Sequence, residues 1–280
     1  MAFLQYFLKS VLSSPIASLF ACSFDSGFLP LDWLRAYITP LFKKGSRQNP
    51  DKYRPIALTD TLCKLMECII KDQLLAFLSS KGIINKNQHG FISNHSTCTN
   101  LLECTHDWLV TLNSSKTTDV VYINFSRAFD SIVHAKLLNK LENYGITGKL
   151  LCWIASFILD RYQCVAIENC FSSVAKVISG VPQGSVLGPI LFIIFINDID
   201  NVCYGRTSLK LFADDAKLYS EIDLNHSSSS LQTSLNNLAA GADAWQLLIN
   251  VEKCFVLSTV RSKRSNQSIS NKYYLNGVLL

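Results

Sequence analysis

Apolar positions recur at helical spacing along several stretches of the chain. Within residues 61–78 the hydrophobic side chains fall three or four positions apart and leave lysine and glutamate on the other face. This pattern predicts an amphipathic helix. Similar patterns predict helices over residues 97–112, 135–144, 149–159 and 229–248, a buried helix over 186–199, and a helix over 3–20 that breaks near Pro15.

Shorter stretches are rich in the β-branched and aromatic residues typical of strands. Residues 119–125 read Asp-Val-Val-Tyr-Ile-Asn-Phe, which predicts a strand. Extended segments are also expected over 33–42, 53–58, 208–211 and 216–219, with a hairpin over 163–178. Helices and strands interleave without a regular strand-helix-strand repeat, so the sequence predicts an α+β fold with a sheet backed by helices, not a doubly wound one.

Composition limits the class of protein. A chain of 280 residues that is 49% hydrophobic and 17% charged can bury a large core, which excludes a disordered protein. The net charge is +5 and the pI is near 8.6, which favours an anionic partner only weakly and does not identify it.

The 10 cysteines include no Cys-x-x-Cys pair, so reduced, buried thiols in an intracellular protein are expected. Residues 1–22 are apolar, but they lack a basic leader and contain Lys9, which argues against a secretory signal. No stretch reaches about 18 uninterrupted apolar residues, so a spanning helix is not expected. The expected location is the cytoplasm or nucleus.

The chemistry of the chain is concentrated at Phe212-Ala213-Asp214-Asp215, between two predicted strands. Two adjacent aspartates repel each other, so a cation is expected to compensate them. Mg²⁺ prefers carboxylate and phosphate oxygens, and a pair of such ions supports in-line attack on phosphorus. A solvated turn is the alternative for an isolated Asp-Asp pair.

The pair is accompanied by other blocks in a fixed order. The residues from Asn124 to Ser131 read Asn-Phe-Ser-Arg-Ala-Phe-Asp-Ser, and those from Ser179 to Pro189 read Ser-Gly-Val-Pro-Gln-Gly-Ser-Val-Leu-Gly-Pro. Further blocks are Tyr53-Arg54-Pro55-Ile56, Lys64 with Glu67, Gln88-His89-Gly90-Phe91, and Asn250 with Lys253. In order, spacing and residue identity, these blocks resemble the motifs of the reverse transcriptases of non-LTR (LINE-like) retrotransposons, from about Trp33 onward.

The resemblance implies the fingers and palm of a right-hand polymerase, with an antiparallel palm sheet backed by helices. It implies fingers at 33–117, a palm at 118–260, and a basic linker with the last palm hairpin at 261–280. The segment before them, 1–32, is expected to be an N-terminal helical segment from its own pattern of apolar residues. The thumb is expected to be missing or truncated. The implied reaction is template-directed nucleotidyl transfer with two Mg²⁺ ions, an RNA template, a DNA primer and deoxynucleoside triphosphates.

Two residues of the first block depart from the family pattern, and Arg127, which replaces Lys and keeps the charge, matters less than Asn124. The family has Asp where this chain has Asn124, and the resemblance makes that position a metal ligand together with Asp214 and Asp215. A neutral amide offers one oxygen where a bridging carboxylate is needed, so weakened Mg²⁺ binding and impaired polymerisation are expected. By the two-residue strand period, Asp119 points to the opposite face, and Asp130 lies past the turn, so neither is expected to substitute.

The other implied roles concern nucleotide binding, by Arg54, Lys43, Lys44, Phe125, Phe129, Gln183 and Lys253. Arg54 with Lys43 or Lys44 would grip the triphosphate, since guanidinium suits phosphate, although either lysine fits an exposed basic loop equally well. Phe129 matches the ring that excludes a ribose 2′-hydroxyl and also fits a core aromatic. For Lys253 an ordinary surface lysine is the alternative.

Two other functions remain open at this point. A non-catalytic nucleic-acid-binding remnant would keep the groove and lose the chemistry. An RNA-dependent RNA polymerase shares the palm, but Phe129 and the Phe-Ala-Asp-Asp block argue against it.

Overall fold

The computed structural model describes residues 2–222, 229–259 and 271–280, with backbone only for residues 2–10. The chain forms two compact units, each built from two segments: Met1–Leu78 with His134–Gly188, and Ser79–Val133 with Pro189–Leu280. These units do not coincide with the ranges expected for fingers and palm, which remain predictions of functional subdomains. Each unit is described by itself.

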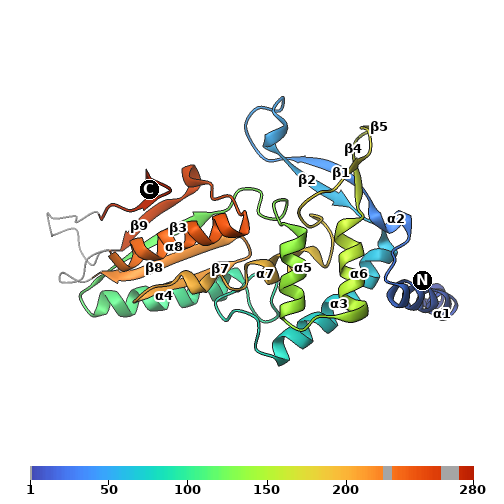
Figure 1. Cartoon of the computed structure of the whole chain (residues 1–280), viewed down its shortest axis with the longest axis horizontal. Coiled ribbons are helices and arrows are strands. Elements are labelled where there is room, and N and C mark those ends of the chain that lie inside the picture. Colours follow the sequence, from blue (N-terminus) through green and yellow to red (C-terminus); the bar gives the residue numbers. More distant parts are fainter. Residues whose placement is uncertain (1, 223–228, 260–270) are drawn as a thin grey trace. The chain divides into compact units, whose positions relative to one another are not determined.

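The first unit combines helices with a small mixed sheet. Its elements are α1 (Ala2–Ser26), α2 (Leu31–Leu34), β1 (Arg35–Phe42), η1 (Pro50–Lys52), β2 (Tyr53–Leu58), α3 (Thr61–Ser80), α5 (His134–Asn143), α6 (Gly148–Leu159), β4 (Tyr162–Ile167), β5 (Cys170–Phe171) and β6 (Ala175–Lys176). The strand order is β2-β1-β4-β5, with β6 also paired to β4. Strands β1 and β2 are antiparallel, whereas β1 and β4 are parallel (Figure 1).

The predicted break at Pro15 is wrong, because α1 is one helix that contains Pro15. Pro15 lacks the amide that would bond the carbonyl four residues earlier, that of Val11. Both residues are exposed, so water can solvate that carbonyl and the helix continues.

The second unit is a four-stranded sheet with helices. Its elements are α4 (Thr97–Asn113), β3 (Thr117–Asn124), α7 (Gly188–Ile196, from Pro189 onward), η2 (Ile199–Val202), β7 (Thr207–Phe212), β8 (Asp215–Ile222), α8 (Ser229–Trp245), η3 (Val251–Lys253), β9 (Phe255–Thr259), β10 (Tyr274–Leu275) and β11 (Val278–Leu279). The strand order is β7-β8-β3-β9, and every neighbouring pair is antiparallel.

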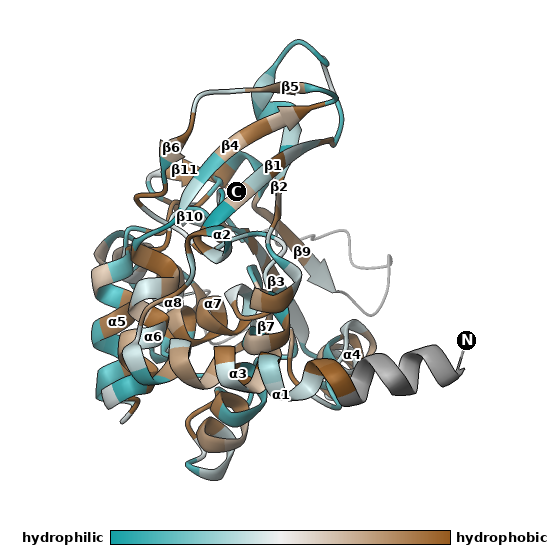
Figure 2. Ribbon diagram, turned by 90° about the vertical axis from the view of Figure 1, so that its right-hand side faces the viewer, coloured by the Kyte–Doolittle hydropathy of each residue, from teal (hydrophilic) through white to brown (hydrophobic). Residues whose placement is uncertain are grey.

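Helices cover both faces of this sheet. Cys104 of α4 packs with Val120 of β3 and Tyr219 of β8, and α8 contacts β7 and β8. Figure 2 shows strands β3 and β7 between α8 and α4. Helix α7 has no polar face and is buried, as its uniformly apolar sequence indicates.

The α+β architecture predicted from the sequence is confirmed, and most predicted helices and strands agree with the structure within a few residues. The ten cysteines are free thiols, but only Cys63, Cys104 and Cys254 are buried, so the expectation of buried thiols is wrong for the other seven. Within the part of the chain that the structure describes, no helix combines the length and the apolar character that crossing a membrane requires. The basic stretch expected after residue 260 lies mostly outside the described residues.

Candidate functional site

The Asp214-Asp215 pair lies at a tight hairpin turn. Strands β7 and β8 pair as far as Phe212 opposite Asp215, so Ala213 and Asp214 form a two-residue connection. Ala213 has a positive φ of 53°, which matches the first central position of a type II′ turn, where glycine is usual. Asp214 is half-buried and Asp215 is exposed.

Asn124 is the direct cross-strand neighbour of Asp215. The antiparallel register of β3 and β8 places the two Cα atoms opposite each other at the end of the pairing. Side chains at directly opposed positions point to the same face, with Cβ atoms roughly 4.5–5.5 Å apart. The structure therefore brings Asn124 beside Asp215, the second residue of the Asp-Asp pair. The role of both residues as metal ligands stays a prediction.

Asn124 is also held by the segment that follows α8. The amide of Asn250 donates to the Asn124 carbonyl at 2.8 Å, and the amide of Asn124 donates to Cys254 Sγ at 3.4 Å. The second contact brings η3, with Lys253, next to the end of β3. The sequence paired Asn250 with Lys253, and both lie at this site.

A pocket of about 300 Å³ opens at this end of the sheet. Its polar lining includes Asn124, Asp215, Lys217 and Lys253, and α4 contributes Thr97, Asn100 and the apolar Leu101. Tyr122 and Phe255, two further lining residues, stack with ring centroids 4.6 Å apart. The pocket therefore combines acidic, basic and aromatic groups within the second unit.

Asp119 lies on the other face of β3 and has partners of its own. Its carboxylate accepts hydrogen bonds from Ser258 Oγ at 2.5 Å, Asn271 Nδ2 at 2.7 Å and the Tyr273 hydroxyl at 2.7 Å. Burial and the Asp119 carboxylate raise the pKa of Tyr273. Asp119 thus fastens the last hairpin to the sheet, a role that no pattern in the sequence indicates.

Asp214 and Asp215 are of a chemical type that suits Mg²⁺, but they have no third acidic residue beside them among the described residues. Carboxylate and amide oxygens are donors that Mg²⁺ accepts. Over residues 2–222, 229–259 and 271–280, however, no group of three or more His, Cys, Asp or Glu lies close enough to hold a metal ion. Neither Asp119 nor Asp130 therefore completes a three-acid group around Asp214 and Asp215.

Phe125 and Phe129 follow Asn124 into the core of the second unit. Phe125 is buried, with a relative exposure of 4%. The half-buried Phe129 stacks on Phe192 at 4.5 Å and meets Phe91 edge-on at 6.5 Å. Phe129 is therefore a core aromatic that keeps some exposure, and the nucleotide-contact role of both rings stays a prediction.

The basic residues expected at the triphosphate lie in the first unit. Arg54 is exposed on β2, opposite Leu41 of β1. Lys43 and Lys44 follow β1, and the amide of Lys43 bonds the carbonyl of Lys52 at 2.8 Å. Arg54, Lys43 and Lys44 thus gather at one end of the β1–β2 hairpin, and their shared role at the triphosphate stays a prediction.

Gln183 lies in a loop of the first unit that closely approaches β2. The amide of Ala57 donates to the Gln183 carbonyl at 2.7 Å. Gly184 has a φ of 118°, and a Cβ there would lie 2.5 Å from the carbonyl oxygen of Ala57. Only glycine accepts both that backbone conformation and that contact.

A buried carboxylate anchors the same loop. Glu67 of α3 is fully buried, and its Oε2 accepts from the amides of Val186 at 2.7 Å and Leu187 at 2.8 Å. Burial raises the pKa of Glu67, while these amides and the charge of Arg161 oppose that shift. The sequence marked Glu67 only as part of a block, since its partners are distant along the chain.

Comparison with known proteins gives the relationship of the chain. The profile of the family described as "Reverse transcriptase (RNA-dependent DNA polymerase)" matches residues 42–270. The probable RNA-directed DNA polymerase from transposon BS of Drosophila melanogaster is 32% identical over 251 residues, which are 83% of this chain and 27% of that protein. The RNA-directed DNA polymerase from mobile element jockey of the same fly is 30% identical over 273 residues, 95% of this chain and 29% of that protein.

Solved structures support the same fold. Apo telomerase from Candida tropicalis, truncated from its C-terminal domain, superposes with a TM-score of 0.60 at 12% identity, over 96% of this chain and 58% of that one. Telomerase from the same yeast with a fragment of telomeric RNA gives 0.61 at 12% identity, over 95% and 46%. At this identity the likeness concerns the fold alone, and the chain spans less than a third of the two transposon proteins.

The family profile covers most of the chain, and the carboxylate turn lies within the matched residues. The chain therefore belongs to the reverse transcriptase (RNA-dependent DNA polymerase) family and is related to the polymerases of non-LTR retrotransposons.

Proposed function

We propose that this chain is the polymerising part of a retroelement reverse transcriptase, which extends a DNA primer on an RNA template with deoxynucleoside triphosphates. One observation carries the proposal: Asn124 lies directly opposite Asp215, next to the turn that bears Asp214. This is the constellation to which the family assigns its metal ligands. The pocket beside it, with Lys217 and Lys253, has cations for a polyphosphate.

In this proposal Asp214 and Asp215 hold Mg²⁺, with the side-chain Oδ1 of Asn124 as a neutral third donor. Bound Mg²⁺ would neutralise charge on the triphosphate and stabilise the displacement at phosphorus. Lys253 would attract the same phosphates, and Phe129 would limit the space beside the sugar. In the other unit, Arg54, Lys43, Lys44 and Gln183 are proposed to contact the nucleotide.

We expect the polymerase activity to be impaired by the amide at position 124. A neutral ligand leaves the site one negative charge short and holds the ion less firmly. Displacement of reacting groups by about 1 Å costs on the order of 10²-fold in rate. Synthesis by the natural chain should therefore be at least roughly 10²-fold slower than by a chain with a carboxylate there.

Primer extension on an RNA template tests this directly. The natural chain is compared with Asn124→Asp over a range of Mg²⁺ concentrations, and Asp214→Asn in the Asn124→Asp background is the matched control. We expect Asn124→Asp to gain synthesis and the control to lose it. Equal rates for the natural chain and Asn124→Asp would contradict the impairment, and no synthesis by Asn124→Asp would contradict the assigned site.

A second candidate function, nucleic-acid binding without chemistry, is favoured by the same amide. Lys217 and Lys253 remain at the pocket whether or not metal is held. This function predicts salt-dependent binding of a primed template in EDTA, since each phosphate contact releases counterions. Binding that is absent at low salt excludes it.

A further inference from the structure

The segment before α4 lies along the free edge of β7. The amide of His89 donates to the carbonyl of Leu211 at 2.9 Å, and the amide of Leu211 donates to the carbonyl of Asn87 at 2.9 Å. These two bonds form a parallel bridge between Gln88 and Leu211. The segment therefore extends the sheet beyond β7, next to the strand that leads into the Asp214 turn.

Gln88 joins this segment to the turn through one side-chain oxygen. Its Oε1 accepts from the amide of Gly90 at 2.7 Å and from the amide of Ala213 at 2.9 Å. Ala213 directly precedes Asp214, is buried, and has a positive φ. A non-glycine residue in that conformation is strained and persists only where its surroundings hold it.

Gly90 is a second feature of the same contact. A Cβ at Gly90 would lie 2.4 Å from the amide nitrogen of Ala213 and 3.0 Å from Gln88 Oε1. The segment can approach the turn this closely only with glycine at that position. The hydrogen bond and the absent side chain thus point independently to close packing of the segment on the turn.

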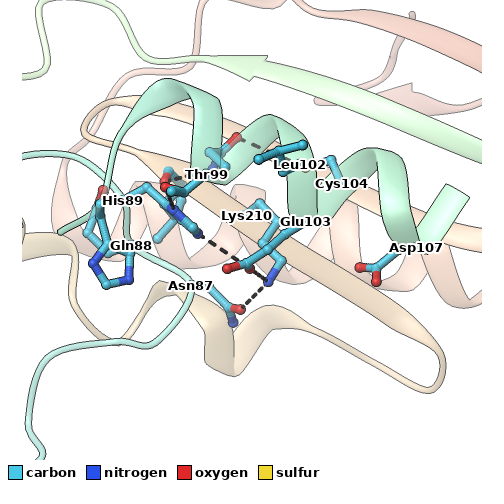
Figure 3. Close-up of polar contacts among 12 residues, drawn as sticks. Asn87, Gln88, His89, Thr99, Leu102, Glu103, Cys104, Asp107 and Lys210 are labelled. Carbon is cyan, nitrogen blue, oxygen red and sulfur yellow. Dashed lines mark hydrogen bonds and ion pairs between the residues drawn. The ribbon is translucent and has the colours of Figure 1, made fainter.

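The segment is itself fastened to α4 and β7. His89 Nδ1 lies 2.9 Å from Thr99 Oγ1. Lys210 of β7 donates to Asn87 Oδ1 at 3.3 Å and to Glu103 Oε2 at 2.5 Å, as Figure 3 shows. Because these contacts hold the segment in place, the position of the Gln88 side-chain oxygen is fixed.

We infer that Gln88 is a positioning residue for the carboxylate turn, which fixes Ala213 in its left-handed conformation and so sets the direction in which Asp214 leaves the strand. The inference rests on the proposed function in so far as Asp214 serves catalysis. Without the Gln88 oxygen, the buried amide of Ala213 has no acceptor from this segment, and the turn relaxes to solvate it. Asp214 then moves, although no ligand has been removed.

Amide hydrogen exchange measured by NMR tests the hydrogen bond without reference to activity. Gln88→Met keeps the length of the side chain and removes the acceptor, while Asn87→Ala, in the same segment, removes only a contact to Lys210. We expect Gln88→Met to speed exchange at Ala213 by about 10-fold, the effect of one lost hydrogen bond. Exchange at Val121, in the centre of the sheet, should stay at its parent value in both variants.

Gln88→Glu serves as the conservative variant because it keeps an acceptor oxygen in place. It should protect the Ala213 amide as the parent does, and it keeps the test decisive if Gln88→Met does not fold. Exchange at Ala213 that is unchanged in Gln88→Met, or no faster than in Asn87→Ala, overturns the positioning role. So does equal loss of protection in the Glu and Met variants.

Primer extension in the Asn124→Asp background supplies the functional readout. Gln88→Met should lower kcat by roughly 10- to 100-fold and change KM for the nucleotide by less than about 3-fold, since the ligands are misplaced but not lost. A fall in kcat no larger than that of Asn87→Ala overturns the catalytic part. If Ala213 exchange responds while Asn124→Asp extends no primer, the positioning of the turn stands and the proposed function fails.

Discussion

Gly184 allows a direct test of how the loop at Gln183 is held. Its φ of 118° lies outside the left-handed region that other residues can enter, and a Cβ there would lie 2.5 Å from the carbonyl oxygen of Ala57. That contact is with backbone, so no side-chain rotation relieves it. In Gly184→Ala the loop must therefore move away from β2 or change its conformation.

The expected magnitude follows from two contributions. Backbone strain of this kind costs on the order of 1–3 kcal/mol. Moving the loop also breaks the hydrogen bond from the Ala57 amide to the Gln183 carbonyl, which contributes about 1 kcal/mol. We therefore expect Gly184→Ala to lower the free energy of unfolding by roughly 2–4 kcal/mol.

Gly82 provides the matched control. Its φ is 62°, within the left-handed region, and a Cβ there would meet nothing within 4 Å. Gly82→Ala should therefore cost only the conformational strain, about 1–2 kcal/mol. Urea unfolding of both variants separates the contributions, and equal losses would show that the contact with Ala57 does not constrain the loop.

Three further outcomes are expected. In EDTA, Asn124→Asp should lower the free energy of unfolding by like-charge repulsion. With Mg²⁺ at 100 times its Kd, the free energy of unfolding of this variant should rise by about 2.7 kcal/mol, and that of the natural chain should rise less at the same concentration; equal increases in chemical unfolding would contradict this. Burial lowers the pKa of His134, whose Nε2 lies 2.7 Å from the Gly180 carbonyl, so the unfolded chain protonates first, at its ordinary pKa of 6.5. Stability should then fall as pH drops below 6.5, by up to about 1.4 kcal/mol per unit, and an unchanged slope in His134→Gln would exclude this residue as the cause. Asp119→Ala leaves three donors without their acceptor and should lower the free energy of unfolding by about 3 kcal/mol or more, against about 1 kcal/mol for Tyr273→Phe. Equal losses in thermal unfolding would show that the carboxylate does not hold all three donors.

The amino-acid sequence by itself determined the features that depend on neighbouring residues. Periodicity located α3, α4 and α8, because an apolar stripe at helical spacing needs only one face to bury. The β-branched run before Asn124 indicated β3, and the two-residue period placed Asp119 and Asn124 on opposite faces, as the structure has them. The Phe-Ala-Asp-Asp turn was also predicted from the sequence, because the two strands that it joins are adjacent in the chain.

Other features were decided only by tertiary structure. The register that sets Asn124 opposite Asp215, the capture of Asp119 by Tyr273, and the hold of Gln88 on Ala213 each join segments that are far apart in sequence. Pro15 shows the same limit, since its effect on α1 depends on whether the freed carbonyl meets water. The sequence shows which side chains can donate or accept a hydrogen bond. Which distant amide serves as the partner depends on how sheets and helices pack. An unsatisfied polar group becomes costly only when the folded chain buries it.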